Sequence, residues 1–266
     1  MAGRQTEVPP QTLPDHVYAF VATILLWLYF TVGFVVFFLF FYLAAWFFSR
    51  DRERAFQRLN SRFYRGFFRL ARIIIPRHDW QIDDTIKHIK SSVIVCNHVS
   101  YLDPLILISL FEHHKTIVKS KFFQMPVFGW LITTAGYLPS TTEGRFSQMM
   151  IDHIEKMGDY LTVGGNLFIF PEGTRSRDGR LGTFNKGAFK IARLCKAPIK
   201  VVRICNSDKL YTPGKFLFNT GRRNTITVTL MGQIDPDYEH NPPTASELES
   251  QVRRQLCTAN CVYLNS

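Results

Sequence analysis

The chain has 266 residues, of which 46% are hydrophobic, and its formal net charge is +11 at pH 7. At this length it holds one domain, or one domain with an appendage. Its five cysteines are scattered and show no zinc-type spacing, which argues against a zinc module and predicts reduced thiols. We therefore expect no metal site.

The first predicted element is an uncharged segment, Val17 to Ser49, that is dense in aromatic and aliphatic residues. A membrane-spanning helix needs roughly 20 such residues, and a straight helix over residues 17–48 would be ~48 Å long, against a hydrocarbon core of ~30 Å. The segment must tilt, extend into the interface or break near Gly33, which leaves a single span and a hairpin both open. We interpret residues 17–49 as a membrane anchor, rather than a buried core helix or a signal peptide, and residues 1–16 as a flexible N-terminus.

Arginines follow the apolar segment at a spacing of three or four residues. They are Arg50, Arg54, Arg58, Arg62, Arg65, Arg69 and Arg72. On a helix over residues 50–76 they form one stripe, and an apolar stripe lies across from it. Its members are Phe56, Leu59, Phe63, Phe67, Leu70 and Ile74. This pattern predicts a basic amphipathic helix on anionic lipid headgroups, with a solvated face packed on the domain or a nucleic-acid surface as alternatives. The arginine excess places this side of the anchor in the cytoplasm.

From residue 77 onwards, short apolar runs alternate with amphipathic segments. The expected strands are 92–96, 116–119, 167–170, 199–204 and 225–234, and the expected helices are 104–111, 149–161, 186–195 and 246–256. This alternation predicts an α/β sheet that is covered on both faces. We predict one α/β domain over residues 77–266, a single mixed sheet flanked by helices and preceded by an anchoring helix or helical hairpin.

A potential base and a carboxylate lie close together in the segment after the first predicted strand. His98 and Asp103, five positions apart on one helix, would point ~140° away from each other. They meet only if His98 lies in the strand-exit turn and Asp103 begins a helix, and Asp103-Pro104 is a helix-start signal. The carboxylate can then bind one ring nitrogen and leave the other free as a base. The alternative is a capping aspartate beside an unrelated histidine.

A second polar segment follows the strand that ends near Phe170. Its sequence is Phe-Pro-Glu-Gly-Thr-Arg-Ser, residues 170–176. Gly173 permits unusual backbone angles and the close approach of a ligand, and Arg175 can hold a phosphate through its planar fork. The alternative is a surface turn whose arginine meets solvent.

These two segments carry a family resemblance. Asn97–Pro104 resembles the N-H-x-S-x-x-D block of the membrane glycerolipid acyltransferases, and Phe170–Ser176 resembles their F-P-E-G-T-R-S block. Phe184–Ala188 resembles the F-K-x-G block that follows, and Ala197–Ile199 the final V-P-I block. Order and spacing agree over residues 80–205. The chain therefore resembles the 1-acylglycerol-3-phosphate acyltransferases and their relatives, which implies an α/β domain docked on a membrane.

The resemblance implies a direct acyl transfer without a covalent acyl-enzyme. His98 would act as general base on the free hydroxyl of a lysophospholipid, and Asp103 would orient and stabilise its imidazolium. The acyl donor would be a thioester on coenzyme A or acyl carrier protein, used as a co-substrate with no further cofactor. A thioester is activated enough for direct attack, so positioning and a base can suffice; the sequence does not identify an oxyanion stabiliser.

The resemblance also assigns substrate-binding residues. Glu172 and Arg175 would help to bind the acceptor headgroup, and Gly173 and Thr174 would shape the turn. Part of the apolar segment Phe122–Leu138 would form an acyl-chain groove or a membrane-dipping surface, with ordinary core as the alternative.

Two departures concern the phosphate contacts. Relatives often carry a Lys-Lys pair where this chain has Lys119-Ser120, and an arginine where it has Thr142. Lys119 stays a plausible contact, and Arg145, three positions after Thr142, is a candidate. The reaction type is unaffected, but the acceptor is left open.

We predict an enzyme that acylates a lysophospholipid, foremost 1-acylglycerol-3-phosphate to give phosphatidate. The alternatives are an acyltransferase for another lysolipid and a non-catalytic lipid-binding protein. A lipid hydrolase lacks support, because no G-x-S-x-G surrounds Ser100. The expected partners are membrane phospholipids, the lysolipid acceptor, the thioester donor and acyl carrier protein, without nucleic acid. We expect an integral or tightly anchored membrane protein with its catalytic domain on the cytoplasmic face.

Overall fold

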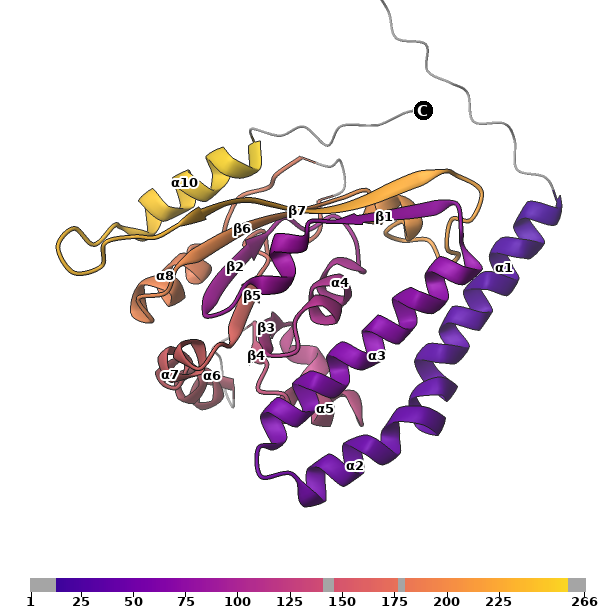
Figure 1. The fold of residues 1–266 in the computed structure, drawn as a ribbon, viewed down its shortest axis with the longest axis horizontal. Coiled ribbons are helices and arrows are strands. Elements are labelled where there is room, and N and C mark those ends of the chain that lie inside the picture. The colour runs from indigo at the N-terminus through magenta and orange to yellow at the C-terminus, as the bar shows by residue number, and fades with distance from the viewer. Residues whose placement is uncertain (1–12, 141–145, 177–179, 258–266) are drawn as a thin grey trace, which may run out of the picture.

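The computed structural model describes residues 13–140, 146–176 and 180–257, which are built around a sheet of seven strands (Figure 1). The strands are β1 (His78–Ile82), β2 (Ser92–Cys96), β3 (His114–Val118), β4 (Leu138–Pro139), β5 (Asn166–Ile169), β6 (Ile199–Cys205) and β7 (Asn224–Ile234). Their order is β1-β7-β6-β2-β5-β3-β4. The five strands from β6 to β4 are mutually parallel, whereas β7 is antiparallel to β6. The prediction of a mixed sheet is confirmed.

Successive residues of a strand point to opposite faces of the sheet, so they belong alternately to two separate cores. In β2, Ile94 and Cys96 belong to one core, and Val93 and Val95 belong to the other. The first core includes α3 (Arg52–Ile74) and α4 (Asp103–Leu110), and the second includes α8 (Gly187–Leu194) and α10 (Ala245–Cys257). The sheet is therefore covered on both faces, as predicted.

The predicted strands all overlap observed ones, but the sequence patterns missed several short elements. These are β1, β4, α5 (Phe128–Thr134), α9 (Ser207–Leu210) and the 3-10 helices η2 (Asp84–His88) and η3 (Ser120–Gln124). The helix expected over residues 149–161 is two helices, α6 (Phe146–Glu155) and α7 (Met157–Thr162). Elements of two to seven residues carry too little periodicity to be recognised in a sequence.

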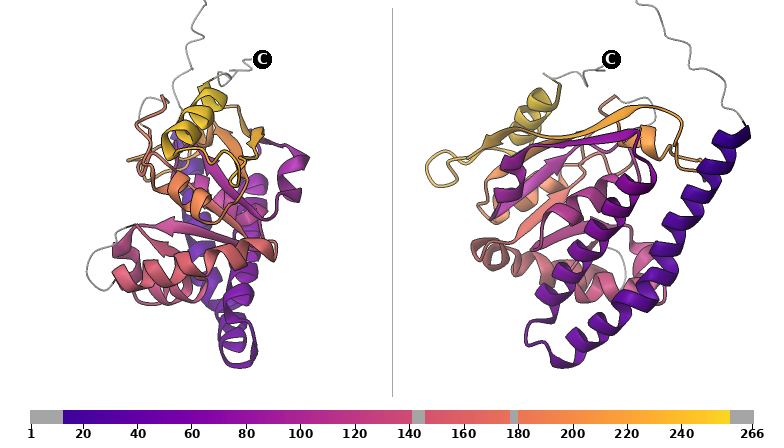
Figure 2. Two further views of the ribbon diagram at one scale, coloured as in Figure 1. Left: turned by 90° about the vertical axis from the view of Figure 1, so that its left-hand side faces the viewer. Right: turned by 45° about the vertical axis from the view of Figure 1, so that its right-hand side comes forward.

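The apolar N-terminal segment is one bent helix, made of α1 (Leu13–Leu28), the π-helical η1 (Tyr29–Phe38) and α2 (Leu39–Phe48). Among the described residues it is the one helix long and apolar enough to cross a membrane. Its bend, which Figure 2 shows, falls at η1 and includes Gly33, where a break was predicted. Because α1 begins at Leu13, residues 13–16 are helical, which corrects the prediction of a flexible N-terminus over residues 1–16.

A buried chain of hydrogen bonds joins this bent helix to the sheet. The Tyr42 hydroxyl donates to Oδ1 of Asn60 (2.6 Å), and Nδ2 of Asn60 donates to the Tyr137 oxygen (3.2 Å). Tyr137 contacts Nε2 of His114 at 2.6 Å, and Nδ1 of His114 contacts the Phe111 carbonyl at 2.7 Å. Because a carbonyl only accepts, Nδ1 carries the proton and Nε2 accepts from Tyr137. Burial lowers the pKa of His114 to about 3, which keeps this imidazole neutral.

The basic amphipathic helix is α3, and its apolar face does not lie on lipid. The carboxylate of Asp51 caps the helix by accepting from the Arg54 amide at 2.9 Å. The central aromatic residues of the apolar stripe are buried against the bent helix and the domain: Phe56, Phe63 and Phe67. The expected membrane-surface helix over residues 50–76 thus packs its central apolar face inside the protein, and most of its arginines are exposed.

Three of the four cysteines within the described ranges follow the prediction. Cys96, Cys195 and Cys257 carry free thiols. Burial raises the pKa of the Cys96 thiol, so this side chain serves as packing beside the site described below. Cys205 is disulfide-bonded, which corrects the expectation of a reduced thiol at that position.

Candidate active site

The predicted catalytic segments meet at the carboxyl edge of the parallel strands. His98 follows β2, Phe170 follows β5, and Ser207 follows β6. The strand order places β2 between β6 and β5, so the three strand exits are neighbours. Ligands of open α/β sheets bind at this edge. Two segments that are more than 60 residues apart in the chain therefore form one site, as the sequence predicted.

Asn97 holds the turn that presents the histidine. Its side-chain amide donates to the Ile204 carbonyl and accepts from the Ile204 N–H, both at 2.8 Å. This exchange prolongs the contact between β2 and β6 beyond the end of β2. The chain then turns, and α4 begins at Asp103 with Pro104 in its first turn. The predicted break between His98 and Asp103 is present.

The carboxylate of Asp103 is fully buried and accepts four hydrogen bonds. Its Oδ2 accepts from Nδ1 of His98 at 2.9 Å and from the amides of Val99 and Ser100, both at 2.7 Å. Its Oδ1 accepts from the Ser207 hydroxyl at 2.5 Å. A carboxylate can be buried without large cost only when donors replace its water, and here they come from two separate segments, the turn after β2 and Ser207 after β6.

The hydrogen bond to Asp103 decides which nitrogen of His98 can react. A carboxylate only accepts, so Nδ1 carries the proton and Nε2 keeps a free lone pair. The Phe170 ring packs on the imidazole, with centroids 4.4 Å apart and an interplanar angle of 30°. The His98 side chain is 16% exposed, so a substrate can reach it while its orientation stays fixed on two sides. This is the arrangement of a general base.

Glu172 joins the two sequence blocks. Its Oε1 accepts from the His98 amide at 3.1 Å, and its Oε2 accepts from the Gly182 amide at 2.9 Å. The Ser176 amide donates to the His98 carbonyl at 2.8 Å, which adds a second link. Both carboxylate oxygens of Glu172 are thus used by the backbone, and we assign Glu172 a positioning role. Its expected contact with the acceptor headgroup stays a prediction.

The Arg175 guanidinium lies over the ring of Tyr101, 3.2 Å from the ring centroid. Its Nη1 is buried and, within the described ranges, has no hydrogen-bond partner. A buried donor without an acceptor costs free energy, which a ligand oxygen would recover. Arg175 is therefore ready to receive an anionic group next to the histidine turn, and it does not merely meet solvent.

The remaining predicted site residues are less closely joined. Gly173 has a positive φ of 63°, the conformation that glycine adopts without strain, and Thr174 is exposed in the same turn. Lys119 is exposed directly after β3, two strands from β2 at the same edge, a lateral separation of ~10 Å. Arg145 lies outside the described residues.

Ser207 belongs to the site but was not predicted. Its hydroxyl faces Asp103 because Asn206, directly after β6, adopts a left-handed conformation with a φ of 63°. Asn206 is held by a hydrogen bond of 2.9 Å from its Nδ2 to the Thr225 carbonyl. One signal was available in the sequence, since Asn206-Ser207 comes shortly after the strand predicted over residues 199–204. In the structure this strand is parallel to the one before His98.

The chain was compared with known proteins. A sequence model described as "Acyltransferase" matches residues 77–205. Over 122 residues the chain is 38% identical to the chloroplastic 1-acyl-sn-glycerol-3-phosphate acyltransferase BAT2 of Brassica napus, which covers 46% of this chain and 35% of that protein. It is 32% identical over 136 residues to the 1-acyl-sn-glycerol-3-phosphate acyltransferase of Saccharomyces cerevisiae. This match covers 50% of this chain and 44% of that protein. The matches thus span a third to a half of these relatives.

The fold has a solved counterpart. The crystal structure of the 1-acyl-sn-glycerophosphate acyltransferase PlsC from Thermotoga maritima superimposes with a TM-score of 0.66. The superposition covers 92% of this chain and 98% of PlsC at 21% sequence identity, so it establishes the fold alone. The match to the sequence model, residues 77–205, includes both blocks that form the site. Residues 77–205 are thus similar to acyltransferases, among them the 1-acyl-sn-glycerol-3-phosphate acyltransferases.

Proposed function

We propose that the protein transfers a fatty acyl group from a thioester to the free hydroxyl of a lysophospholipid, with 1-acylglycerol-3-phosphate as acceptor and phosphatidate as product. The observation that carries this proposal is the buried Asp103 carboxylate, which fixes His98 with Nε2 free, beside a guanidinium whose Nη1 lacks a partner. The names of the matched relatives support the same acceptor.

In the proposed reaction, Nε2 of His98 removes the proton from the acceptor hydroxyl as its oxygen attacks the thioester carbonyl. The imidazolium that forms is stabilised by Asp103, and its proton leaves with the thiolate of the donor. Ser100 is no nucleophile in this scheme, because its hydroxyl donates to the Tyr211 carbonyl at 3.2 Å. The amides of Val99 and Ser100 donate to Asp103, so a tetrahedral oxyanion needs donors from elsewhere.

Arg175 is proposed to hold the phosphate of the acceptor. Its guanidinium is oriented by the Tyr101 ring and offers an unused buried N–H. A guanidinium fork matches two phosphate oxygens, so we expect a lysolipid with a terminal phosphomonoester to be preferred over one with a larger headgroup. Lys119 and Arg145 are proposed as further contacts with the same phosphate.

The donor is proposed to be acyl-coenzyme A or acyl carrier protein, and the bent helix to attach the protein to a membrane. Many of its apolar side chains are exposed, among them Val36 (61%), Phe40 (72%) and Phe48 (87%). The same helix is tied to the domain at Tyr29 and Tyr42, which donate to the Phe63 carbonyl and to Asn60. A helix that is bound along one side to the domain favours shallow insertion into the bilayer. The catalytic domain is proposed to lie on the cytoplasmic face, where the arginine excess after the anchor places it. Protease protection in vesicles distinguishes shallow insertion from a full span, in which residues near Arg4 are shielded.

The proposed function is tested with purified protein, a panel of lysolipids and both donor classes. We expect turnover with acyl-coenzyme A or acyl carrier protein, and the highest kcat/KM for 1-acylglycerol-3-phosphate. Higher kcat/KM for a lysolipid without a phosphomonoester would reassign the acceptor, and no transfer from either donor to any lysolipid would contradict the proposal.

A further inference from the structure

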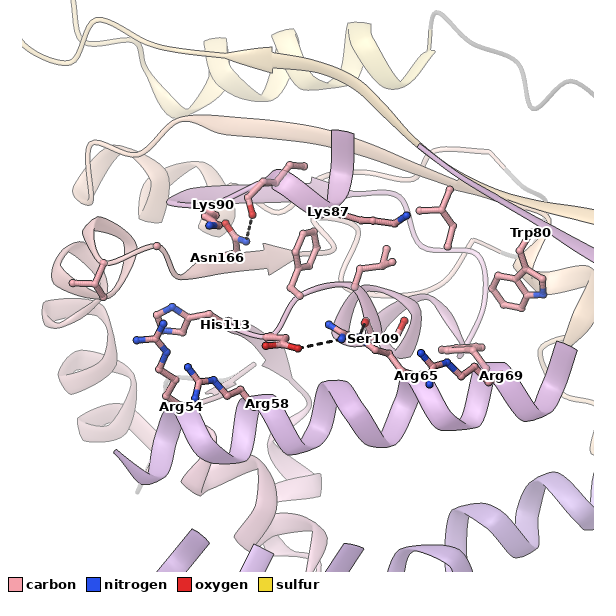
Figure 3. A pocket seen from close by; sticks show the side chains of 18 of the residues that line it. Arg54, Arg58, Arg65, Arg69, Trp80, Lys87, Lys90, Ser109, His113 and Asn166 are labelled. Atoms are coloured by element: carbon pink, nitrogen blue, oxygen red, sulfur yellow. Dashed lines mark hydrogen bonds and ion pairs between the residues drawn. The ribbon is translucent and has the colours of Figure 1, made fainter. Parts of the chain in front are cut away.

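A cavity lies at the opposite edge of the sheet from His98. Its volume is about 810 Å³, and it lies between α3 and the segments that precede β2, β3 and β5 (Figure 3). The five residues of β2, at ~3.3 Å each, place ~13 Å between its amino end and the end that leads to His98. The cavity is therefore separate from the candidate active site.

The walls of this cavity carry charge of one sign. Five arginines enter from α3: Arg54, Arg58, Arg65, Arg69 and Arg72. Figure 3 shows Lys87 and Lys90 on the wall across from the labelled arginines. Of the described residues that line the cavity, Glu112 alone has a carboxylate. Convergent charges of one sign in a concave surface strengthen the local potential.

Few of these cations are neutralised. Arg65 pairs with Glu112 at 3.1 Å, and Lys87 pairs with Asp84 at 2.6 Å. Arg54, Arg58 and Arg69 have no ion pair with any described residue. The guanidinium groups therefore keep their donors available for a ligand.

Burial and the positive charge of the cavity together lower the pKa of a neighbouring histidine. His113 lines the same cavity, and its pKa is lowered to about 4, first by burial and then by the charge of Arg54, with Lys115 and Arg58 contributing and Asp51 opposing. Aromatic side chains complete the surface, since Trp80 lies at one end with the Arg72 guanidinium 5.1 Å from its ring centroid. Phosphate oxygens are the chemistry that guanidinium forks beside an aromatic ring recognise.

We propose that this cavity binds an anion with several phosphate groups, at a site distinct from the one that holds the acceptor. Arg58 and Arg69 are eleven residues apart on α3, which corresponds to ~16 Å along the helix axis. A positively charged surface of this length suits a ligand whose phosphates are spaced along it, or a row of lipid phosphates, better than a single phosphate. The shared chemistry is phosphate, and its source is either a soluble polyphosphate compound or anionic phospholipid headgroups.

The test uses the full chain in detergent at fixed ionic strength and measures binding by calorimetry. One probe is inorganic tripolyphosphate, and the other is phosphatidylglycerol in mixed detergent micelles, which present several lipid phosphates side by side. The variant Arg58→Gln/Arg69→Gln removes two unpaired guanidinium groups from the cavity. The matched control Arg50→Gln/Arg62→Gln removes the same charge from exposed positions that do not line it. Thermal melts establish that both variants fold.

We expect the cavity variant to bind at least tenfold more weakly than wild type, because two charge-assisted hydrogen-bonding groups are lost, and the control to bind within about twofold of it. Loss confined to tripolyphosphate identifies a soluble ligand, and loss confined to phosphatidylglycerol identifies a lipid headgroup. His98→Ala should bind both probes as wild type does. If the wild type binds neither probe, if the cavity variant loses no more than the control, or if His98→Ala loses affinity as well, the proposal is overturned.

Discussion

At the carboxyl edge of the parallel strands the carboxylates of Asp103 and Glu172 are matched to donors, whereas at the amino edge several arginines are exposed without an ion pair to the described residues. Asp103 accepts four hydrogen bonds and Glu172 accepts two, mostly from backbone amides. At the amino edge, Arg58 and Arg69 point from α3 into an open cavity without an ion pair to the described residues.

The difference distinguishes a catalytic site, whose groups are fixed before a substrate binds, from a charged surface whose arginines are free to bind a ligand. A catalytic base must be held in one orientation before the substrate arrives, so its supporting carboxylate is satisfied by fixed groups of the fold. Unpaired arginines cost little free energy while water solvates them and can exchange that water for an anion. Arg175 stands between these cases, because it is fixed by Tyr101 but still has an unused N–H.

After the loss of His98 itself, the largest effect at the carboxyl edge is expected from Asp103→Asn. An amide can donate to His98 as well as accept, so the imidazole loses its fixed tautomer and its stabilised cation. We expect kcat to fall by about 10³-fold, in the range of general-base catalysis, while the acceptor KM changes by less than threefold. Steady-state acyl transfer with the variant measures both. A kcat within tenfold of wild type would show that the carboxylate is only structural.

Arg175→Ala sharpens the distinction between chemistry and binding. Loss of a charge-assisted hydrogen bond to phosphate is worth about 1.5–3 kcal/mol, which predicts an acceptor KM that is raised roughly 10- to 100-fold with a much smaller change in kcat. The donor KM is the internal control and should stay the same. An unchanged acceptor dependence would remove Arg175 from the headgroup site.

Ser207→Ala tests whether the second oxygen of Asp103 matters for positioning. The lost hydrogen bond is worth about 1 kcal/mol when it acts through another residue, so kcat should fall about fivefold at constant KM. Ser207→Thr keeps the hydroxyl and should recover most of the loss. A variant that changes thermal stability but leaves kcat intact would limit Ser207 to folding.

A smaller effect concerns stability, through the buried His114. Its pKa is lowered to about 3 in the fold by burial, whereas the unfolded chain has the usual value near 6.5. The unfolded state therefore binds a proton first as the pH falls, so the stabilisation is complete above pH 6.5 and is lost between there and about pH 3. His114→Gln should flatten the decline of the melting temperature with falling pH over this window.

The matched control for that prediction is Tyr137→Phe, which removes a hydrogen-bond partner of His114 but no titratable imidazole. It should lower the melting temperature at every pH and keep the wild-type slope. Equal slopes for wild type and His114→Gln between pH 6 and pH 4 would show that His114 does not stay neutral in the fold.

The sequence predicted the carboxyl edge far better than the amino edge, for physical reasons. His98, Asp103 and Arg175 lie in short local patterns that follow buried strands, and strand polarity alone brings such segments to one edge. Ser207 was missed because its contact with Asp103 spans 104 positions and depends on the left-handed Asn206, which no local pattern announces.

At the amino edge, the amphipathic pattern of α3 was predicted correctly, but the surroundings of its apolar face were not. The arginine and phenylalanine stripes of α3 were recognised, but amphipathicity does not say whether the apolar face meets lipid or protein. Phe56 and Phe63 pack on the bent helix that precedes them, so the arginines face a cavity of the domain. Only the tertiary contacts of α3 could decide between the alternatives.

The base assignment of His98 is tested most directly by acyl transfer with purified His98→Ala at saturating donor and acceptor. We predict that turnover falls at least about 10³-fold, while the melting temperature and the partition into vesicles stay within error of wild type. Turnover within tenfold of wild type by the folded, membrane-bound variant would contradict the account, because the reaction would then use a base other than His98.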